Sequence, residues 1–480
     1  MINIQELNIK TAREKLRAGE FTARELTQAC LDVIKEKDGD ILTGKEGLHA
    51  FIEVYDDVLS QADEADKQIK AGVDKPLLGI PVALKDNILR KGYLATAASN
   101  ILKGHVATYD SFVVKKLYEA GAILIGRTNM DDSAMGSSTE NSTYGPTKNP
   151  YDVSRVPGGS SGGSAVAVAA GMALASFGSD TGGSIRQPAA FCGIVGMKPT
   201  YGRVSRSGLI ALGSSFDQIG PLTKTAEDAE ILYEVIKGQD IMDSTTLREE
   251  PITNNQETRK IIGVPRSFVE SEGVDERVRQ NFDETVEKFK SLGYKIVDID
   301  IPHAHNALAV YYIILPAEAS SNLARFDGVK YGLHVDGSDG VDDYFKTKGE
   351  GYGKEVRRRI ILGTYVLSSG YYDEYYGSAV KMKKMITDEY QKVFEEVDFV
   401  LTPTTPTPAF KLGEKSSDPL AMYLADIFTV PANIAGLPSI SLPSGFVEEE
   451  GKKLPLGIEL MADLGREDLI FQASKDFLGK

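Results

Sequence analysis

Short apolar runs alternate with amphipathic helical patterns along most of this 480-residue chain. Candidate helices occupy residues 111–120, 164–178 and 275–292, and candidate strands occupy 79–87, 122–126, 260–264, 294–301, 398–403 and 439–443. Strands and helices that alternate in this way form a sheet with helices packed against it. The chain is therefore predicted to have an α/β fold, with a central mixed β-sheet covered by helices on both faces.

The first 70 residues have a helical pattern, and they include five apolar residues at the spacing of one helix face: Leu26, Ala29, Cys30, Val33 and Ile34. We expect an N-terminal helical segment over 1–70. No linker rich in Pro, Gly or Ser divides the remaining chain, and no internal repeat is present. Residues 1–480 are thus expected to form a single domain, with an exposed polar loop at 240–257.

Charge and residue usage argue against several classes of function. The formal net charge of −15 disfavours direct binding to nucleic acid, because phosphate contacts need a basic face. Two cysteines without a CxxC motif and five histidines without an HExxH motif predict no metal site. The N-terminus lacks the apolar core of a signal peptide, and the longest apolar run, 165–177, is too short for a membrane span. We expect a soluble cytoplasmic protein.

The stretch GSDTGGSIRQPAA at 178–190 places two glycines directly before Ser184. Glycine permits tight turns, and Pro188 suits the first turn of a helix. Ser184 is therefore predicted to end a glycine loop just before a helix. Backbone N–H groups in such a loop can hold the oxyanion that a nucleophilic serine generates. Taken alone, the pattern also fits a Gly-rich turn with a capping serine.

A second cluster, VPGGSSGGSA at 156–165, precedes a helix of small residues and admits three interpretations. It could hold phosphate at a helix N-terminus, although neither a GxxxxGK[ST] nor a GxGxxG motif is present. Residues 159–163 also match the G-x-S-x-G nucleophile elbow, which would make Ser161 a nucleophile dependent on a downstream histidine. In the third interpretation, this loop meets the Ser184 loop and both contribute to one site.

The third interpretation needs a general base, and Lys85 is the candidate. Lys85 follows the apolar run 80–84, so it can be buried at the end of a strand. Burial lowers the pKa of a lysine from its ordinary value, and a neutral lysine can accept a proton from a serine. The alternative is a lysine that faces solvent in the turn formed by the sequence KDN.

Lys85 and the two loops together resemble the amidase signature family. Lys85 lies 75 residues before Ser160, and Ser160 lies 24 residues before Ser184, as in the family's Ser-Ser-Lys catalytic set. The resemblance implies the amidase-signature fold over the whole chain, with the catalytic core at about 75–200. It also implies that Ser184 is the nucleophile, and that Ser160 follows a cis peptide bond and links Ser184 to Lys85.

Further roles follow from the same resemblance. The backbone N–H groups of Thr181, Gly182, Gly183 and Ser184 would form the oxyanion hole. Segments such as EASSNLARFDGVKYG at 318–332 and DPLAMYLADIFTVPANIAGLPSISLP at 418–443 are similar to those of the glutamine-hydrolysing subunits of tRNA-dependent amidotransferases. In those subunits the substrate is L-glutamine. The positions that would bind its α-carboxylate, α-ammonium group and remaining surface are Arg359, Asp426 and Tyr311, with Tyr312 adjacent to the last.

The similarity to these subunits also implies partners. One further subunit would bind the tRNA and use ATP and Mg²⁺, a small subunit would wrap the pair, and this chain itself would bind no cofactor. Ammonia would convert Glu-tRNA(Gln) to Gln-tRNA(Gln), or Asp-tRNA(Asn) to Asn-tRNA(Asn). Asp132-Ser133 and Glu459 depart from the subunit pattern, which has Glu-Phe and Gln there. The alternative function is a stand-alone amidase of the same fold acting on another carboxylic amide.

Overall fold

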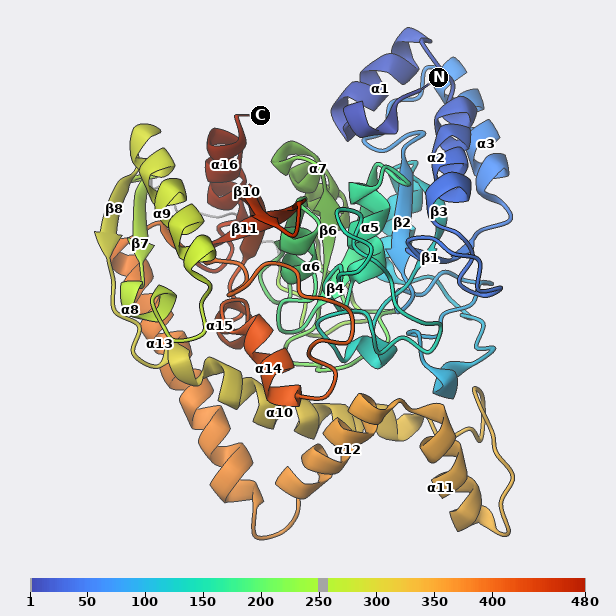
Figure 1. The fold of residues 1–480 in the computed structure, drawn as a ribbon. Helices are drawn as coiled ribbons and strands as arrows, with labels where there is room; N and C mark the ends of the chain where they lie inside the picture. Colours follow the sequence, from blue (N-terminus) through green and yellow to red (C-terminus); the bar gives the residue numbers. More distant parts are fainter. Residues whose placement is uncertain (1, 249–257, 480) are drawn as a thin grey trace.

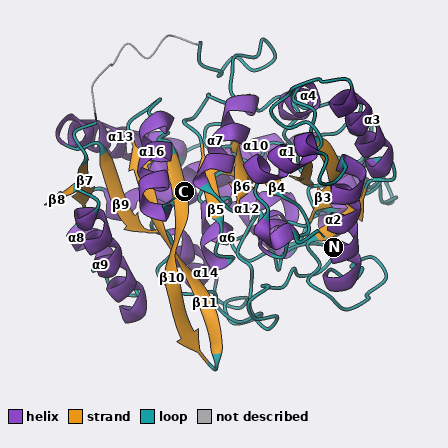
Figure 2. Cartoon of the chain, turned by 90° about the horizontal axis from the view of Figure 1, so that it is seen from above, coloured by secondary structure: helices purple, strands orange, loops and turns teal. Residues whose placement is uncertain are grey.

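A mixed sheet of eleven strands runs through the part of the chain that the computed structural model describes, residues 2–248 and 258–479 (Figures 1 and 2). The strand order is β1-β3-β2-β4-β6-β5-β10-β11-β9-β7-β8. Strand β2 is parallel to β3 and β4, β7 is parallel to β8 and β9, and the other pairs are antiparallel. The strands are β1 Phe51–Val54, β2 Pro81–Lys85, β3 Ile123–Thr128, β4 Ala175–Asp180, β5 Val195–Lys198, β6 Gln218–Thr223, β7 Ile261–Val264, β8 Lys295–Asp298, β9 Phe399–Pro403, β10 Ser439–Glu449 and β11 Lys452–Ala462.

Helices pack against both faces of this sheet, as the alternating pattern predicts. On β5, Val195 and Met197 join the apolar cluster that contains α7, whereas a Cβ at the intervening Gly196 would touch Ala189 of α6. Because successive residues of a strand point to opposite faces, α6 and α7 lie on opposite sides. The helices are α1 Ile9–Ala18, α2 Ala23–Lys37, α3 Val58–Lys70, α4 Phe112–Glu119, α5 Gly162–Ala169, α6 Arg186–Phe191, α7 Ala226–Ile236, α8 Arg266–Val269, α9 Glu276–Ser291, α10 Ala307–Asn322, α11 Gly340–Gly351, α12 Lys354–Val366, α13 Ser378–Glu396, α14 Pro419–Tyr423, α15 Val430–Ala435 and α16 Glu467–Leu478.

Three local predictions need correction or limits. The single helix expected over 164–178 ends at Ala169, and Gly171 adopts a φ of 76° that starts the turn into β4. The N-terminal helical segment is interrupted by β1, which pairs with the buried strand β3 and forms the edge of the sheet. Of the polar loop predicted at 240–257, residues 249–257 lie outside the described residues.

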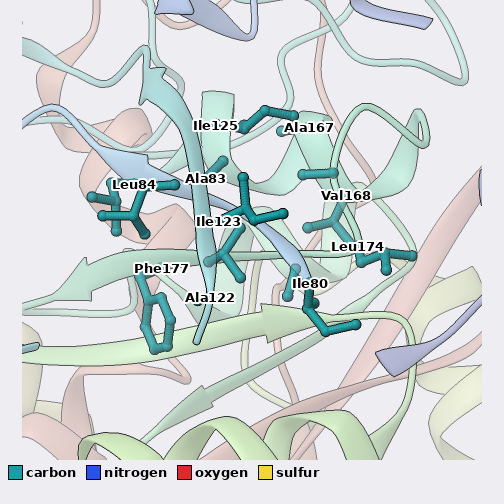
Figure 3. Close-up of a cluster of buried hydrophobic side chains, with 14 of the residues drawn as sticks. Ile80, Ala83, Leu84, Ala122, Ile123, Ile125, Ala167, Val168, Leu174 and Phe177 are labelled. Atoms are coloured by element: carbon teal, nitrogen blue, oxygen red, sulfur yellow. The ribbon is translucent and has the colours of Figure 1, made fainter. Parts of the chain in front are cut away.

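A dense apolar cluster surrounds the parallel strands β2, β3 and β4 (Figure 3). It includes Ile80 and Leu84 of the β2 segment, Ile123 of β3, Val168 of α5 and Phe177 of β4, each almost fully buried. The carboxyl ends of β2 and β4 lie side by side in register, because Leu84 is opposite Phe177. Polar loops that follow such strand ends are where ligands bind in α/β sheets. Lys85 is the last residue of β2, and the Ser184 loop follows the end of β4.

Helices α10, α12 and α13 form a layer along the lower side of the molecule in Figure 1, and α11 extends this layer to the side. Helix α10 packs against both α12 and α13. Among the described residues, no helix combines the length and the apolar character that crossing a bilayer requires.

Candidate active site

Lys85 is the last residue of β2, and its side chain is completely buried. Its Nζ lies 2.7 Å from Ser160 Oγ, 2.8 Å from Ser161 Oγ and 3.0 Å from Ser179 Oγ. Burial lowers the pKa of Lys85 from 10.5 to about 7, against the charges of three nearby carboxylates, including Asp131. The interpretation of Lys85 as a solvent-facing turn residue is therefore wrong.

Ser160 follows a cis peptide bond from Gly159, the conformation that the family resemblance predicts. The Gly159 N–H donates to Gln187 Oε1 over 2.8 Å, which ties this loop to α6. The Ser161 N–H donates to the backbone oxygen of Ser184 over 3.1 Å. The two Ser/Gly loops therefore meet, as the third interpretation of the sequence predicts.

The nucleophile-elbow interpretation of Ser161 does not fit this arrangement. Ser161 is fully buried, and its hydroxyl donates to the backbone oxygen of Ser179 over 3.2 Å while accepting from Lys85. Of the downstream histidines, His303 pairs with Glu389, and His334 lies near Asp336. His305 packs against Phe268. None of the three is positioned as a base for Ser161.

The phosphate-binding interpretation of the 156–165 loop fails for a related reason. Two of its N–H groups already donate within the protein, from Ser161 to Ser184 and from Gly163 to Asn129. A Cβ at Gly162 would lie 2.1 Å from Thr139 Oγ1, so the backbone is packed against protein atoms rather than open to an anion. The N-terminus of α5 is therefore closed.

The loop that carries Ser184 connects β4 to α6. Thr181, Gly182 and Gly183 are buried, and Ser184 is partly exposed. The N–H groups of Thr181, Gly182 and Ser184 have no hydrogen-bond acceptor among the described residues. These three donors are available to an oxyanion, whereas the Gly183 N–H donates to Asp180 Oδ1 over 2.9 Å. The oxyanion role of Gly183 therefore stays a prediction, because its N–H is engaged with Asp180 in this structure.

The buried side chain of Arg186 supports the loop that carries Ser184. Its guanidinium makes a bidentate pair with Asp180, at 3.0 and 2.9 Å, and donates to Glu459 Oε1, the Thr429 backbone oxygen and Asn433 Oδ1. Although burial opposes it, the charge of Arg186 keeps the pKa of Asp180 below its ordinary range. Asp180 and Arg186 are therefore a buried ion pair that supports the loop.

Two departures from the subunit pattern are also explained. Glu459 accepts from Arg186 over 2.6 Å and from Ser439, so a carboxylate serves there as an acceptor where an amide oxygen would suffice. Asp132 accepts the Gly353 N–H over 2.8 Å and ties its loop to the start of α12.

Arg359 lies on the buried side of α12 beside aromatic rings. Its guanidinium carbon is 5.1 Å from the Tyr312 ring centroid and 5.4 Å from that of Tyr423, and its Nε donates to Glu355 over 2.8 Å. The Nη groups of Arg359 have no acceptor among the described residues. Arg359 also lines a small cavity of about 80 Å³ together with Glu355 and Tyr423. The guanidinium retains free donors for a carboxylate.

Asp426 is buried and accepts from the Ser137 hydroxyl over 2.5 Å. Burial raises the pKa of Asp426 to about 7, and the Ser137 hydrogen bond and the charge of Arg359 limit this rise. Asp426 thus lies within the electrostatic influence of Arg359. A carboxylate and a guanidinium in one buried region match the two charges of an amino acid.

The structure also distinguishes the two adjacent tyrosines. A Cβ placed on Gly182 would lie 2.7 Å from Tyr311 Cζ and 2.8 Å from its hydroxyl oxygen, so Tyr311 packs directly on the nucleophile loop. Tyr312 instead stacks on Tyr423, with ring centroids 3.8 Å apart. Tyr311, rather than Tyr312, contacts the predicted oxyanion loop.

Sequence reasoning missed several residues that complete the site. Asp217 accepts the Thr181 hydroxyl over 2.7 Å, and burial raises the pKa of Asp217 to about 6. The others hold the loops or fill the space between them: Ser137, Ser179, Gln187 and Thr429. Asp217 stands in the segment SSFDQIGPL, where no catalytic motif marks it. Isolated serines and threonines carry no such signal either.

Comparison of the sequence with known proteins identifies its family. The amidase family model matches residues 26–471. The A subunit of glutamyl-tRNA(Gln) amidotransferase of Desulfatibacillum aliphaticivorans is 48% identical, over 99% of this chain and 98% of the relative. The corresponding protein of Thermoanaerobacter pseudethanolicus is 50% identical, over 96% and 93%.

Solved structures of related proteins have the same fold. The crystal structure of the glutamyl-tRNA(Gln) amidotransferase A subunit from Thermotoga maritima has a TM-score of 0.77 and 42% identity, covering 99% of this chain and 94% of that one. Peptide amidase from Stenotrophomonas maltophilia has a TM-score of 0.81 and 26% identity, covering 99% and 96%. The chain therefore belongs to the amidase family, and within it to the glutamyl-tRNA(Gln) amidotransferase A subunits.

Proposed function

We propose that this chain hydrolyses L-glutamine and supplies the ammonia to a tRNA-dependent amidotransferase. The observation that carries the proposal is the buried Lys85 Nζ at 2.7 Å from Ser160 Oγ, in a loop bonded to the Ser184 loop. The name of the relatives, which are A subunits of glutamyl-tRNA(Gln) amidotransferase, supports the substrate and the pathway.

In the first half-reaction, Ser184 Oγ attacks the side-chain amide carbon of glutamine. Its proton passes to Ser160, and the Ser160 proton passes to neutral Lys85. The N–H groups of Thr181, Gly182 and Ser184 stabilise the negative charge on the amide oxygen. The carbon–nitrogen bond then breaks as the proton returns through Ser160 to the departing nitrogen, which leaves as ammonia. A γ-glutamyl ester remains on Ser184.

In the second half-reaction, water attacks the ester along the same proton path and releases L-glutamate. The arrangement around Lys85 suits this relay. As a neutral amine, Lys85 has two N–H donors, for Ser161 and Ser179, and one lone pair for the Ser160 hydroxyl. Ser161 is therefore assigned to holding Lys85, and Ser160 to carrying the proton.

Substrate selection is assigned to the charged pair. Arg359 would bind the α-carboxylate and Asp426 the α-ammonium group, while Tyr311 would pack against the substrate beside Gly182. A neutral amide would leave the Arg359 Nη donors unused and Asp426 with only the Ser137 hydroxyl as a donor, which is unfavourable. This argument favours glutamine over the simple amides that a stand-alone amidase of the same fold would accept.

We further propose two partner subunits, because the relatives are named as subunits of an amidotransferase. One would bind tRNA and activate its glutamate, or aspartate in Asp-tRNA(Asn), with ATP and Mg²⁺, in the cytoplasm. The other would be the small wrapping subunit. This chain would bind no cofactor. Exposed apolar side chains on α12, at Ile361, Leu362 and Tyr365, are consistent with a chain that works in a complex.

The test is ammonia release by the purified chain, with and without its partner subunits, from L-glutamine and from a panel of simple amides. Ser184→Ala serves as the blank. We expect release from glutamine that the substitution abolishes. Release from simple amides with glutamine ignored would support the stand-alone alternative and refute the roles given to Arg359 and Asp426.

A further inference from the structure

We propose that Thr429 is a positioning residue that fixes the peptide plane between Gly182 and Gly183 and thereby aligns the oxyanion donors on either side of it. The inference rests on the proposed glutaminase function. It assigns to Thr429 no contact with substrate.

The peptide plane between Gly182 and Gly183 is anchored at both ends. Its carbonyl oxygen, on Gly182, accepts from Thr429 Oγ1 over 2.7 Å. Its N–H, on Gly183, donates to Asp180 Oδ1 over 2.9 Å. Asp180 is in turn fixed by the bidentate pair with Arg186. The Thr429 hydroxyl and the Asp180 carboxylate thus hold opposite ends of one peptide group.

The glycines on both sides make these anchors necessary. Gly183 has a φ of 127°, which L-residues with side chains rarely adopt, and a Cβ there would lie 2.2 Å from Thr429 Oγ1. Glycine at both positions leaves the peptide plane free to reorient at little intrinsic penalty. Unless the changes in ψ of Gly182 and φ of Gly183 cancel each other, reorientation turns the N–H groups of Gly182 and Ser184 relative to each other. Those are two of the three free donors of the loop.

Thr429 is itself held in place by the segment that carries Asp426. It is fully buried and directly precedes α15. Its N–H donates to the Asp426 backbone oxygen over 3.2 Å, and its own backbone oxygen accepts from Arg186 over 2.8 Å. The residue therefore connects the segment that is proposed to bind the α-ammonium group with the loop that is proposed to hold the oxyanion.

Two backbone carbonyl oxygens lie within hydrogen-bond distance of the Thr429 hydroxyl. Besides Gly182 O at 2.7 Å, Asp426 O lies at 3.1 Å, and a hydroxyl has one hydrogen to donate. The shorter contact identifies the Gly182 carbonyl as the main acceptor. Removal of the hydroxyl therefore releases the nucleophile loop first. The hydrogen bond from the Thr429 N–H to the Asp426 carbonyl remains.

The test compares Thr429→Val with Thr429→Ser in the full chain, with its partner subunits if activity requires them. Valine keeps the branched shape and loses the donor, whereas serine keeps the donor. We expect Thr429→Val to lower kcat for glutamine roughly tenfold, about the effect of one lost neutral hydrogen bond. The KM should change by less than about threefold, because the Asp426 segment keeps its backbone bond. Thr429→Ser should restore kcat to near the wild-type value.

Thr27→Val is the matched control. Thr27 lies in α2, is equally buried, and its hydroxyl has no hydrogen-bond partner among the described residues. This substitution should leave kcat unchanged. If Thr429→Val fails to fold, Thr429→Ala is measured against Thr429→Ser in the same way.

The outcomes separate this inference from the proposed function. Wild-type chain and complex that release no ammonia from glutamine would refute the proposed function, and this inference with it. Active wild type with an unchanged kcat in Thr429→Val would overturn the role of Thr429 alone. A kcat loss that serine does not restore, or a loss confined to KM, would also overturn it, because either indicates packing or substrate binding.

Discussion

Replacement of Lys85 by methionine tests whether the lysine is neutral in the folded protein. Methionine has a similar length and no charge, so Lys85→Met removes the titrating group from a fully buried position. It also removes the hydrogen bonds to Ser160 and Ser161, but that effect on the free energy of unfolding does not depend on pH. The pH dependence of the difference between the two proteins therefore isolates the lysine.

The magnitude follows from the pKa. Burial lowers the pKa of Lys85 from 10.5 to about 7. Between these values the unfolded chain binds more protons than the folded one, so the free energy of unfolding of the wild type rises with pH. The slope is about 1.4 kcal/mol per pH unit. From pH 7.5 to 9.5, the wild type should gain roughly 2–3 kcal/mol relative to Lys85→Met.

The assay is urea unfolding of both proteins, followed by circular dichroism, at closely spaced pH values between 6 and 10. We expect the stability difference between the two proteins to be flat below the pKa of about 7 and to shift in favour of the wild type as the pH rises above it. A difference that stays constant from pH 7 to 9.5 would mean that Lys85 remains protonated. Its proposed role as the proton acceptor would then be refuted.

Three further predictions concern the rest of the site. Asp426→Asn should raise the KM for glutamine at least tenfold with a smaller effect on kcat. The raised pKa of Asp426 predicts that the wild-type KM depends on pH near 7, and the substitution should remove this dependence. Steady-state kinetics from pH 6 to 9 would show both effects. Arg186→Met should lower the free energy of unfolding by roughly 3–5 kcal/mol, because it leaves Asp180 buried without its partner; denaturant unfolding would measure the loss. Ser160→Ala should abolish ammonia release, while Ser161→Ala should retain measurable kcat; equal losses would contradict the assignment of the relay.

Much of the fold follows from local patterns in the sequence. The strands β2, β3, β7 and β9 are apolar runs between turn residues, and their positions are predicted closely, whereas β10 starts where predicted but continues to Glu449. The end of α5 is not predicted, because the run 165–177 is apolar apart from Gly171 and Ser176 and has no period that separates helix from strand. Only Gly171 marks the change, and tertiary pairing with β2 and β6 decides it.

The candidate site, like the fold, could be predicted from the sequence only in part. The positions of Lys85, Ser160 and Ser184 follow from their motifs and intervals, and the structure brings their segments together. The engagement of the Gly183 N–H could not be predicted, because it depends on how the Asp180 side chain turns within the loop. Thr429 lies 245 residues beyond Ser184 in a segment without a catalytic motif. Its contact with Gly182 arises from tertiary packing of the segment that precedes α15.

The most direct test of the central claim is to trap the covalent intermediate. The full chain, with its partner subunits if needed, is mixed with L-glutamine, quenched in acid within the first turnover, digested and analysed by mass spectrometry. The account predicts a glutamyl group esterified to Ser184, absent in Ser184→Ala. A glutamyl group on Ser161, or ammonia release with no acylated serine, would contradict it.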